Sequence, residues 1–428
     1  MNGETRPARR LAARFTAILL AGFLSGCAHY AALPLATNPP LAPTIEALDR
    51  ASPAPLTGPL SVTDIVDLAL ANNPELKAAR LKRAIAAGQT KQAGTLPNPS
   101  LTGAFLPLLS GVGTVPAWNV GLGQDLKTLL TYRTRRRAAQ DSERQVAADV
   151  VWQEWQVAGQ ARQIASDLIV GRTSRASYFA AYQLLAARNA KLEQALAARN
   201  VTLVTVAPDR VALQAARSAL NVLDQKQLAL THQLNALLGL APDVVVPLTT
   251  QVDLPPFDPA AIRAVLATLP ERRPDLIALR MGYAAADAQV RQAIQSQFPD
   301  LVLGGSISSD NSSVINGGPT ATLSLPVFDR NQGNVAITQA TRAQLHADYA
   351  ARLASTIGTV GAMLREMEQL SAQLVEARRD LPAARLAAER AQAAFGASNL
   401  DERGYVDCPY CDKRFVLKGG AADSAQAA

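Results

Sequence analysis

The chain has 428 residues and a net charge of +7; 48% of its residues are hydrophobic and only 5% are aromatic. An alanine-rich, aromatic-poor chain favours long helices that pack closely over a single bulky core. The mild positive charge comes without a long basic block, which argues against a nucleic-acid partner. Three cysteines, Cys27, Cys408 and Cys411, are too few for a disulfide framework.

The first 27 residues have the pattern of a targeting segment. Four arginines precede an apolar run from Phe15 to Phe23, which is too short to span a bilayer as a helix. Leu24-Ser25-Gly26-Cys27 resembles a bacterial lipobox, which implies that the Cys27 thiol is acylated and that Cys27 begins the mature chain. Ala28 follows, and by the same resemblance this favours sorting to the outer membrane. An ordinary signal peptide with an incidental cysteine is the alternative.

A proline-rich tether is expected over residues 28–60, and a first structural repeat over residues 61–241. The repeat opens with a cap-like Ser61-Val62-Thr63-Asp64 and a helical stretch that reaches Gln92, divided at Pro74. Strand-like alternation then predicts a hairpin of Leu101–Leu106 and Ala117–Leu126. Trp118, Val120, Leu122 and Leu126 would lie on one face, and Asn119, Gly121, Gly123 and Asp125 on the other.

A very long helix is predicted from Lys127 to about Arg199, since only glycines interrupt the pattern. After a turn near Val206–Asp209, a return helix runs to Leu240. Its expected seam is a strict heptad: Leu213, Ala216, Leu220, Leu223, Gln227, Leu230, Leu234 and Leu237.

The same design recurs 200 residues later without a gap. The matching pairs are Pro74 and Pro274, Leu76 and Leu276, Ala78 and Ala278, Arg80 and Arg280, Gln89 and Gln289, and Pro99 and Pro299. This register indicates a tandem duplication. A linker over residues 242–259, with a strand-like Val244–Val246, separates the copies, and the second repeat covers residues 260–407.

In the second copy we expect strands at Leu301–Ile307 and Thr320–Phe328, joined by a loop over residues 310–318. Leu323, Leu325 and Val327 would share one face of the second strand. The long helix that follows has a heptad of Leu353, Ile357, Val360, Leu364, Met367, Ser371 and Leu374.

The stretch Leu323–Asn334 resembles the strand end of TolC-type outer-membrane efflux proteins. Its Asp329-Arg330-Asn331-Gln332-Gly333-Asn334 portion is most similar to the heavy-metal branch of that family, and Arg273–Leu276 and Asn399–Asp401 also resemble it. The resemblance covers roughly residues 60–407.

The resemblance implies a mainly helical lipoprotein with a small β part. Three chains would close one barrel in the outer membrane, and their long helices would form a periplasmic tunnel. The tunnel would meet an adaptor protein and an inner-membrane pump near residues 199–209 and 395–404. Asp209, Arg210, Asp401 and Glu402 lie near that entrance and would either gate it by charge or only cap helices.

The second copy departs from the family pattern after residue 407, because no heptad follows. We therefore expect the second return helix to be missing and the assembly to be weakened. Residues 408–428 resemble the tail of small zinc-finger proteins, with Cys408-Pro409-Tyr410-Cys411 as a two-thiol knuckle. Zinc needs four ligands, and no others lie nearby in the sequence, so the site would be incomplete; a vestige of another gene is the alternative.

The sequence favours a passive channel that exports metal ions or small toxic compounds. The alternative is a periplasmic coiled-coil lipoprotein with a structural or adaptor role. We find no paired acids, activated nucleophile or phosphate loop, and therefore expect neither an enzyme nor a cofactor.

Overall fold

The computed structural model describes residues 30–50, 58–113, 115–253, 257–396, 405–407 and 414–416. The chain forms two compact units. The described residues up to Pro74 and Gln160–Val252 make the first unit; those of Glu75–Gly159 and Asp253–Ala428 make the second. The elements are η1 (Ile45–Ala47), α2 (Val62–Asn72), α3 (Pro74–Ala93), β1 (Ser100–Leu106), β2 (Ala117–Asp125), α4 (Leu126–Ala197), α5 (Leu203–Leu238), α6 (Pro259–Leu266), α7 (Leu269–Arg272), α8 (Pro274–Gln295), β3 (Leu301–Ser309), β4 (Ile315–Leu323), α9 (Gln332–Gly396), β5 (Tyr405–Asp407) and β6 (Arg414–Val416).

The helical start predicted at Ser61 is confirmed. The Ser61 side chain accepts from the backbone N–H of Asp64, and the Asp64 carboxylate accepts from the backbone N–H of Ser61. This capping box satisfies N–H groups that a helix start otherwise leaves unpaired. The predicted division at Pro74 is confirmed too, because α2 ends at Asn72 and α3 begins at Pro74.

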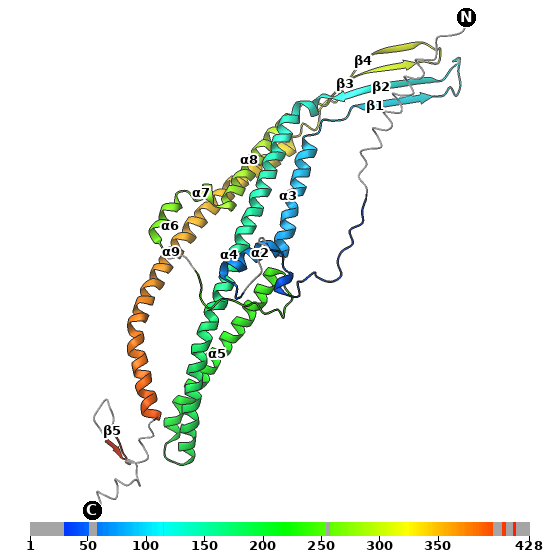
Figure 1. Cartoon of the computed structure of the whole chain (residues 1–428). Coiled ribbons are helices and arrows are strands. Elements are labelled where there is room, and N and C mark those ends of the chain that lie inside the picture. Colours follow the sequence, from blue (N-terminus) through cyan, green and yellow to red (C-terminus); the bar gives the residue numbers. More distant parts are fainter. Residues whose placement is uncertain are drawn as a thin grey trace, which may run out of the picture. The chain divides into compact units, whose positions relative to one another are not determined.

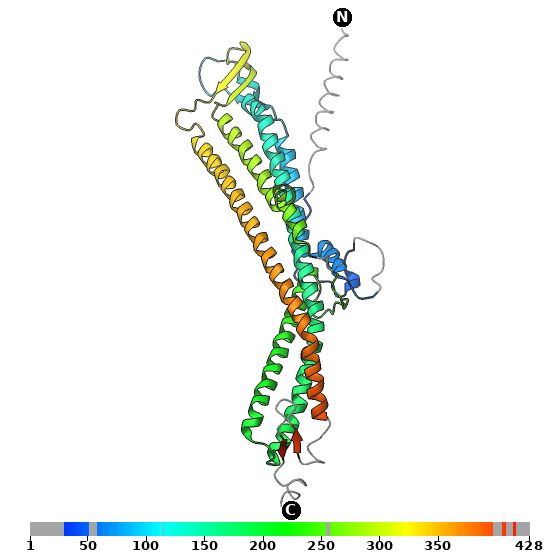
Figure 2. The same ribbon diagram turned by 90° about the vertical axis from the view of Figure 1, so that its left-hand side faces the viewer.

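In the first unit, α5 returns alongside the distal half of α4 (Figures 1 and 2). Every position of the predicted α5 heptad is buried or half-buried, which confirms the seam. Leu234 and Leu238 are almost fully buried, and so is Leu240 just beyond the helix.

The turn between α4 and α5 lies earlier than predicted. The chain reverses over residues 198–202, where Arg199 has a φ of 61°. Pro208, expected in the turn, lies inside α5. A proline there removes one helical hydrogen bond, but the Thr202 carbonyl accepts from the N–H groups of both Thr205 and Val206, and the Val206 side chain is fully buried. These hydrogen bonds and the burial of Val206 allow α5 to begin at Leu203, before the proline.

The prediction of a strand at Val244–Val246 is wrong. The Asn235 amide donates to the carbonyls of Ala241, Pro242 and Val244, at 3.3, 2.9 and 2.9 Å. These bonds occupy the carbonyls that strand pairing would need, so the segment crosses the end of α5 as an irregular chain.

The second unit contains α3, α8, α9 and a four-stranded antiparallel sheet in the order β1-β2-β3-β4 (Figure 1). β4 begins and ends earlier than predicted. The Asp310 carboxylate accepts from the N–H groups of Ser312 and Val314 at 2.8 and 3.0 Å, which shortens the loop and lets β4 start at Ile315. The pairing ends at Leu323, so the alternation at Leu325 and Val327 belongs to a connection that contains Pro326, which has no N–H to donate.

Helix α9 is covered along its first part only. Thr356 and Leu364 are buried, whereas residues 365–390 are all exposed. The expected absence of a second return helix falls on residues 397–428, of which the structure describes only β5 and β6, paired with each other. It stays a prediction.

Candidate functional site

The two faces of the sheet differ in chemistry. Residues paired across antiparallel strands project to the same face, so the register assigns each side chain to a face. One face carries Leu101, Phe105, Trp118, Val120, Leu122, Leu303, Ile307, Ile315 and Leu323. The other carries mainly small or polar residues: Ser100, Thr102, Asn119, Gly121, Gly123, Gly304, Ser306, Ser308, Asn316, Thr320 and Thr322. The faces predicted for Trp118–Asp125 are therefore confirmed.

Most of the apolar face is open to the surroundings in the single chain. Leu101 is 74% exposed, and Phe105, Leu122 and Ile307 are also exposed. An exposed apolar face opposite a small, polar face is the pattern of strands that separate lipid from water. β1 and β4 each pair on one side only, so the described sheet has two open edges.

The small residues of the polar face allow the strands to approach closely. A Cβ added at Gly304 would lie 2.0 Å from the carbonyl oxygen of Leu122 on β2. No side chain fits at that distance, so the β2–β3 pairing depends on glycine at this position.

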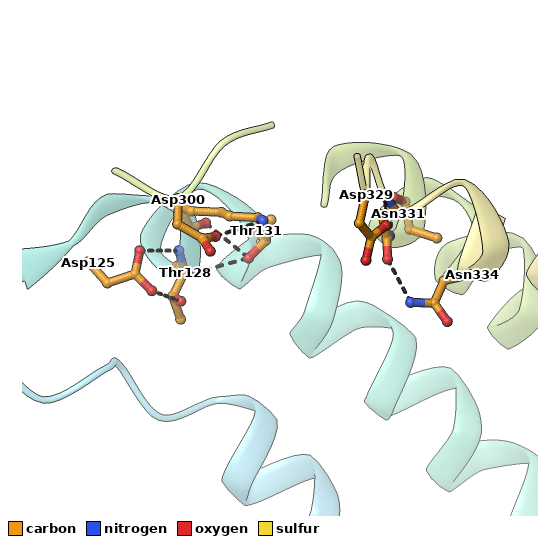
Figure 3. A network of polar contacts seen from close by, with 9 residues as sticks. Asp125, Thr128, Thr131, Asp300, Asp329, Asn331 and Asn334 are labelled. Atoms are coloured by element: carbon orange, nitrogen blue, oxygen red, sulfur yellow. Dashed lines mark hydrogen bonds and ion pairs between the residues drawn. The ribbon is translucent and has the colours of Figure 1, made fainter. Parts of the chain in front are cut away.

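After the first hairpin, the sheet passes into α4 without a loop, because β2 ends at Asp125 and α4 begins at Leu126. The Asp125 carboxylate accepts from the N–H and the hydroxyl of Thr128 (Figure 3). Lys127 pairs with Asp300 at 2.7 Å, just before β3. These contacts hold the start of the helix against the sheet.

After the second hairpin, a connection over residues 324–331 joins β4 to α9; the first half of the Asp329–Asn334 motif lies in this connection and the second half begins α9. Asn331 has a φ of 61°, and its N–H donates to the Asp329 carboxylate at 2.8 Å. Its amide donates to the Ala293 carbonyl of α8 at 2.9 Å and accepts from Asn334 at 2.6 Å (Figure 3). The motif therefore sets the angle at which the chain enters α9.

The predicted entrance charges Asp209 and Arg210 are held in ion pairs between α4 and α5. Arg188 lies 2.8 Å from Asp209, and Arg210 donates twice to Glu193, at 2.5 and 2.8 Å. The bonds from Arg210 lower the pKa of the Glu193 carboxyl, and those bonds raise the pKa of Arg210. The sequence analysis did not single out Arg188 or Glu193, although arginine and acid residues spaced along two adjacent helices were a usable signal.

A third ion pair of this kind joins the two helices further along. Arg175 donates to both carboxylate oxygens of Asp224, at 2.6 and 3.2 Å. This pair lowers the pKa of the Asp224 carboxyl, and the sequence analysis missed it as well. The distal α4–α5 pair is thus fixed by charge as well as by its heptad seam.

The Arg273–Leu276 motif forms a compact junction in the second unit. The Arg273 guanidinium lies over the stacked rings of Trp152 and Trp155, 5.1 and 5.6 Å from their centroids. It also donates to the buried Asp275 carboxylate at 2.7 Å. The cation–π contact holds the start of α8 against α4, and the ion pair to Asp275 orients the guanidinium, so the motif has a structural role.

Four predicted site residues and the lipidation site lie outside the described residues: Cys27, Asp401, Glu402, Cys408 and Cys411. Among the described residues, no group of three or more histidine, cysteine, aspartate or glutamate side chains could hold a metal ion. None of the described helices is long and apolar enough to cross a membrane.

Residues 265–398 match the family of outer membrane efflux proteins. No curated protein matches the sequence. Among solved structures, CusC, described in terms of transmembrane channel formation, is 18% identical with a TM-score of 0.60, over 86% of this chain and 90% of that one. A membrane protein from Pseudomonas aeruginosa is 20% identical with a TM-score of 0.63, over 88% and 90% of the two chains.

The CmeC outer membrane channel of Campylobacter jejuni is 18% identical with a TM-score of 0.63, over 80% of this chain and 78% of that one. The matched family and these channels are not enzymes, in agreement with the prediction. By the sequence of residues 265–398 and by the fold of most of its length, the chain is confirmed to resemble the TolC-type outer-membrane efflux proteins.

Proposed function

We propose that this chain is one subunit of an outer-membrane channel in a tripartite efflux system. The observation that carries the proposal is the sheet, with one exposed apolar face, one small and polar face, and two open edges. An open edge cannot exist in lipid because its backbone N–H and C=O groups would find no partner there. Other copies of the chain must therefore supply the missing neighbours of β1 and β4.

Three copies give a closed barrel of reasonable size. Each chain contributes four strands, so a trimer closes twelve, an even number within the range of bacterial barrels. β2, β3 and β4 have nine residues each, which is about the length that a tilted strand needs to cross the hydrocarbon core. The apolar face would meet lipid, and the serine, threonine, asparagine and glycine face would meet water in the pore.

The long helices extend this pore into the periplasm. α4 has 72 residues and α9 has 65, so α4 is about 108 Å long at ~1.5 Å per residue. Such helices would form a passive tunnel whose far end meets an adaptor protein and an inner-membrane pump. Acylation of Cys27 would add a lipid anchor at the N-terminus.

The cargo that we propose is a metal ion or a small toxic compound. The metal-ion part depends only on the resemblance of Asp329–Asn334 to the heavy-metal branch.

We also keep the proposal that residues 408–428 supply no second return helix. The exposed residues 365–390 of α9 support it, and a weakened trimer is the expected consequence.

The test is to purify the full chain from outer membranes in mild detergent. We expect a trimer that shifts in mobility on heating and forms ion-conducting channels in a planar bilayer. Mass measurement of the N-terminal peptide should show an acylated Cys27. A monomer that neither shifts on heating nor conducts would refute the proposed channel, whatever the state of Cys27.

A further inference from the structure

A polar cleft lies where the first hairpin joins its helices. Its volume is about 660 Å³, and it lies between the end of α3 and the start of α4. The polar side chains that line it are Gln89, Gln92, Thr95, Asn98, Thr128 and Arg135. Leu96, which is 61% exposed, adds an apolar wall beside them.

Arg135 supplies a cation with unused N–H donors. Its Nε donates to the Ala93 carbonyl at 3.1 Å, and one Nη2 proton goes to the Thr95 carbonyl at 3.0 Å. A guanidinium has five N–H donors, so three are left over. Among the described residues no carboxylate pairs with it. These donors sit in a fixed fork, a geometry that matches phosphate oxygens.

Further arginines surround the cleft. Arg133 and Arg136 are exposed and have no acidic partner in the described part of the chain. The side chain of Arg136 lies over Gly94 at the end of α3, with its Cδ 3.8 Å from where a Cβ on Gly94 would be. The nearby carboxylate of Asp125 accepts from the N–H and hydroxyl of Thr128, and Lys127 is paired with Asp300. The local balance is therefore positive.

The position of the cleft points to its ligand. Asn98 lies two residues before β1, and Thr128 lies three residues after β2 ends. In the proposed channel, on which this inference rests, these strand ends lie at the membrane surface, at the level of the lipid headgroups. Basic side chains at that level attract anionic lipids.

We propose that this cleft binds a phosphate group, and that its source is an anionic phospholipid of the membrane. The Arg135 fork would receive the phosphate oxygens, Arg133 and Arg136 would add long-range attraction, and Leu96 would contact the start of an acyl chain. Free phosphate shares the same oxygen chemistry, but it has no apolar part to contact Leu96.

The experiment uses the full chain in detergent, after its channel conductance has been measured. Soluble dihexanoyl-phosphatidylglycerol, dihexanoyl-phosphatidylcholine and inorganic phosphate are each titrated and followed by calorimetry. We expect phosphatidylglycerol to bind most tightly, and more weakly as salt is raised. Arg135→Gln should weaken it roughly five-fold or more, as should the double variant Arg133→Gln/Arg136→Gln.

Arg137→Gln is the matched control. Arg137 lies on the same helix turn, but the carboxylate of Asp141, 4.0 Å away, offsets its charge, so binding should not change. Arg135 also bonds the carbonyls of Ala93 and Thr95. If Arg135→Gln fails to fold for that reason, the double variant, whose arginines have no described bond to a helix carbonyl, decides by itself.

Equal binding of the two lipids, or equal losses in Arg137→Gln and the cleft variants, would overturn the proposal. If inorganic phosphate bound as tightly as phosphatidylglycerol, the proposal that the phosphate group comes from a lipid would be wrong. Normal conductance with no preference between the lipids would refute the lipid site alone. A parent chain that does not conduct would refute the proposed channel itself.

Discussion

The two long helices, α4 and α9, both follow hairpins of the same sheet, yet they are covered very differently. The distal half of α4 has a partner, α5, whose heptad positions are all buried or half-buried. Residues 369–390 of α9 are all exposed within the described chain, and Leu370, Leu374, Val375 and Leu386 are 47–67% exposed. A heptad in the sequence therefore identifies an apolar seam, but it does not reveal what covers that seam.

Charge distinguishes the two helices in the same way. Ion pairs join α4 to α5 at Arg175–Asp224, Arg188–Asp209 and Glu193–Arg210. On α9, Glu368 pairs with Arg263 of α6, and beyond it the described ion pair is between neighbours, Arg379 and Asp380. Exposed pairs add little stability, but complementary charges along a seam select the partner and the register of two helices.

The largest effect that we predict tests the hairpins at the head of each long helix. Gly304→Val on β3 should lower the free energy of unfolding by about 4 kcal/mol or more, since its Cβ would lie 2.0 Å from the Leu122 carbonyl oxygen. Gly103→Val on β1 is the matched control. Its Cβ would have only the Asn119 carbonyl within reach, at 3.9 Å, and valine favours strands.

The measurement is the yield of heat-modifiable trimer extracted from the outer membrane. We expect almost none for Gly304→Val and a normal yield for Gly103→Val. Equal yields from the two variants would mean that the strands do not approach as closely as the β2–β3 register requires.

The next effect sharpens the comparison of the long helices directly. Leu234→Ala in the α5 seam should destabilise the chain by about 2–5 kcal/mol, because Leu234 is 1% exposed. Leu374→Ala on α9 should change stability by less than about 0.5 kcal/mol, because Leu374 is half exposed. Thermal unfolding followed by circular dichroism gives both values. A comparable loss for Leu374→Ala would show that another chain covers α9.

Much of this architecture could be predicted from local pattern. The capping residues at Ser61, the proline break at Pro74 and the alternation of Trp118–Asp125 each act through neighbours in sequence, and each prediction is confirmed. The errors arose where burial and individual hydrogen bonds outweigh the sequence pattern. The Thr202 carbonyl and the buried Val206 override Pro208, and the Asn235 amide prevents pairing at Val244. The partners of Asp209 and Arg210 depend on how α4 meets α5, which the sequence does not state.

The smallest predicted effect concerns the covered half of α9, where Asp287 of α8 pairs with Arg342 of α9 at 2.8 Å and with Arg291 at 2.7 Å. The bond from Arg342 and the charge of Arg291 lower the pKa of the Asp287 carboxyl below its usual 3.8. A lowered pKa adds stability above the unfolded value, and this stability is lost as pH falls through the folded value.

Asp287→Asn should therefore lower the free energy of unfolding by up to about 1 kcal/mol at pH 7 and by almost nothing near pH 2. The effect at pH 7 is small because both partners are partly exposed. Asp348→Asn is the control, since Asp348 is exposed on α9 and has no described ion-pair partner. Thermal midpoints of both variants and the parent at pH 7 and pH 2 give the comparison. If Asp287→Asn kept its full cost at pH 2, the loss would come from packing of the side chain, and α8 would hold α9 by shape rather than by charge.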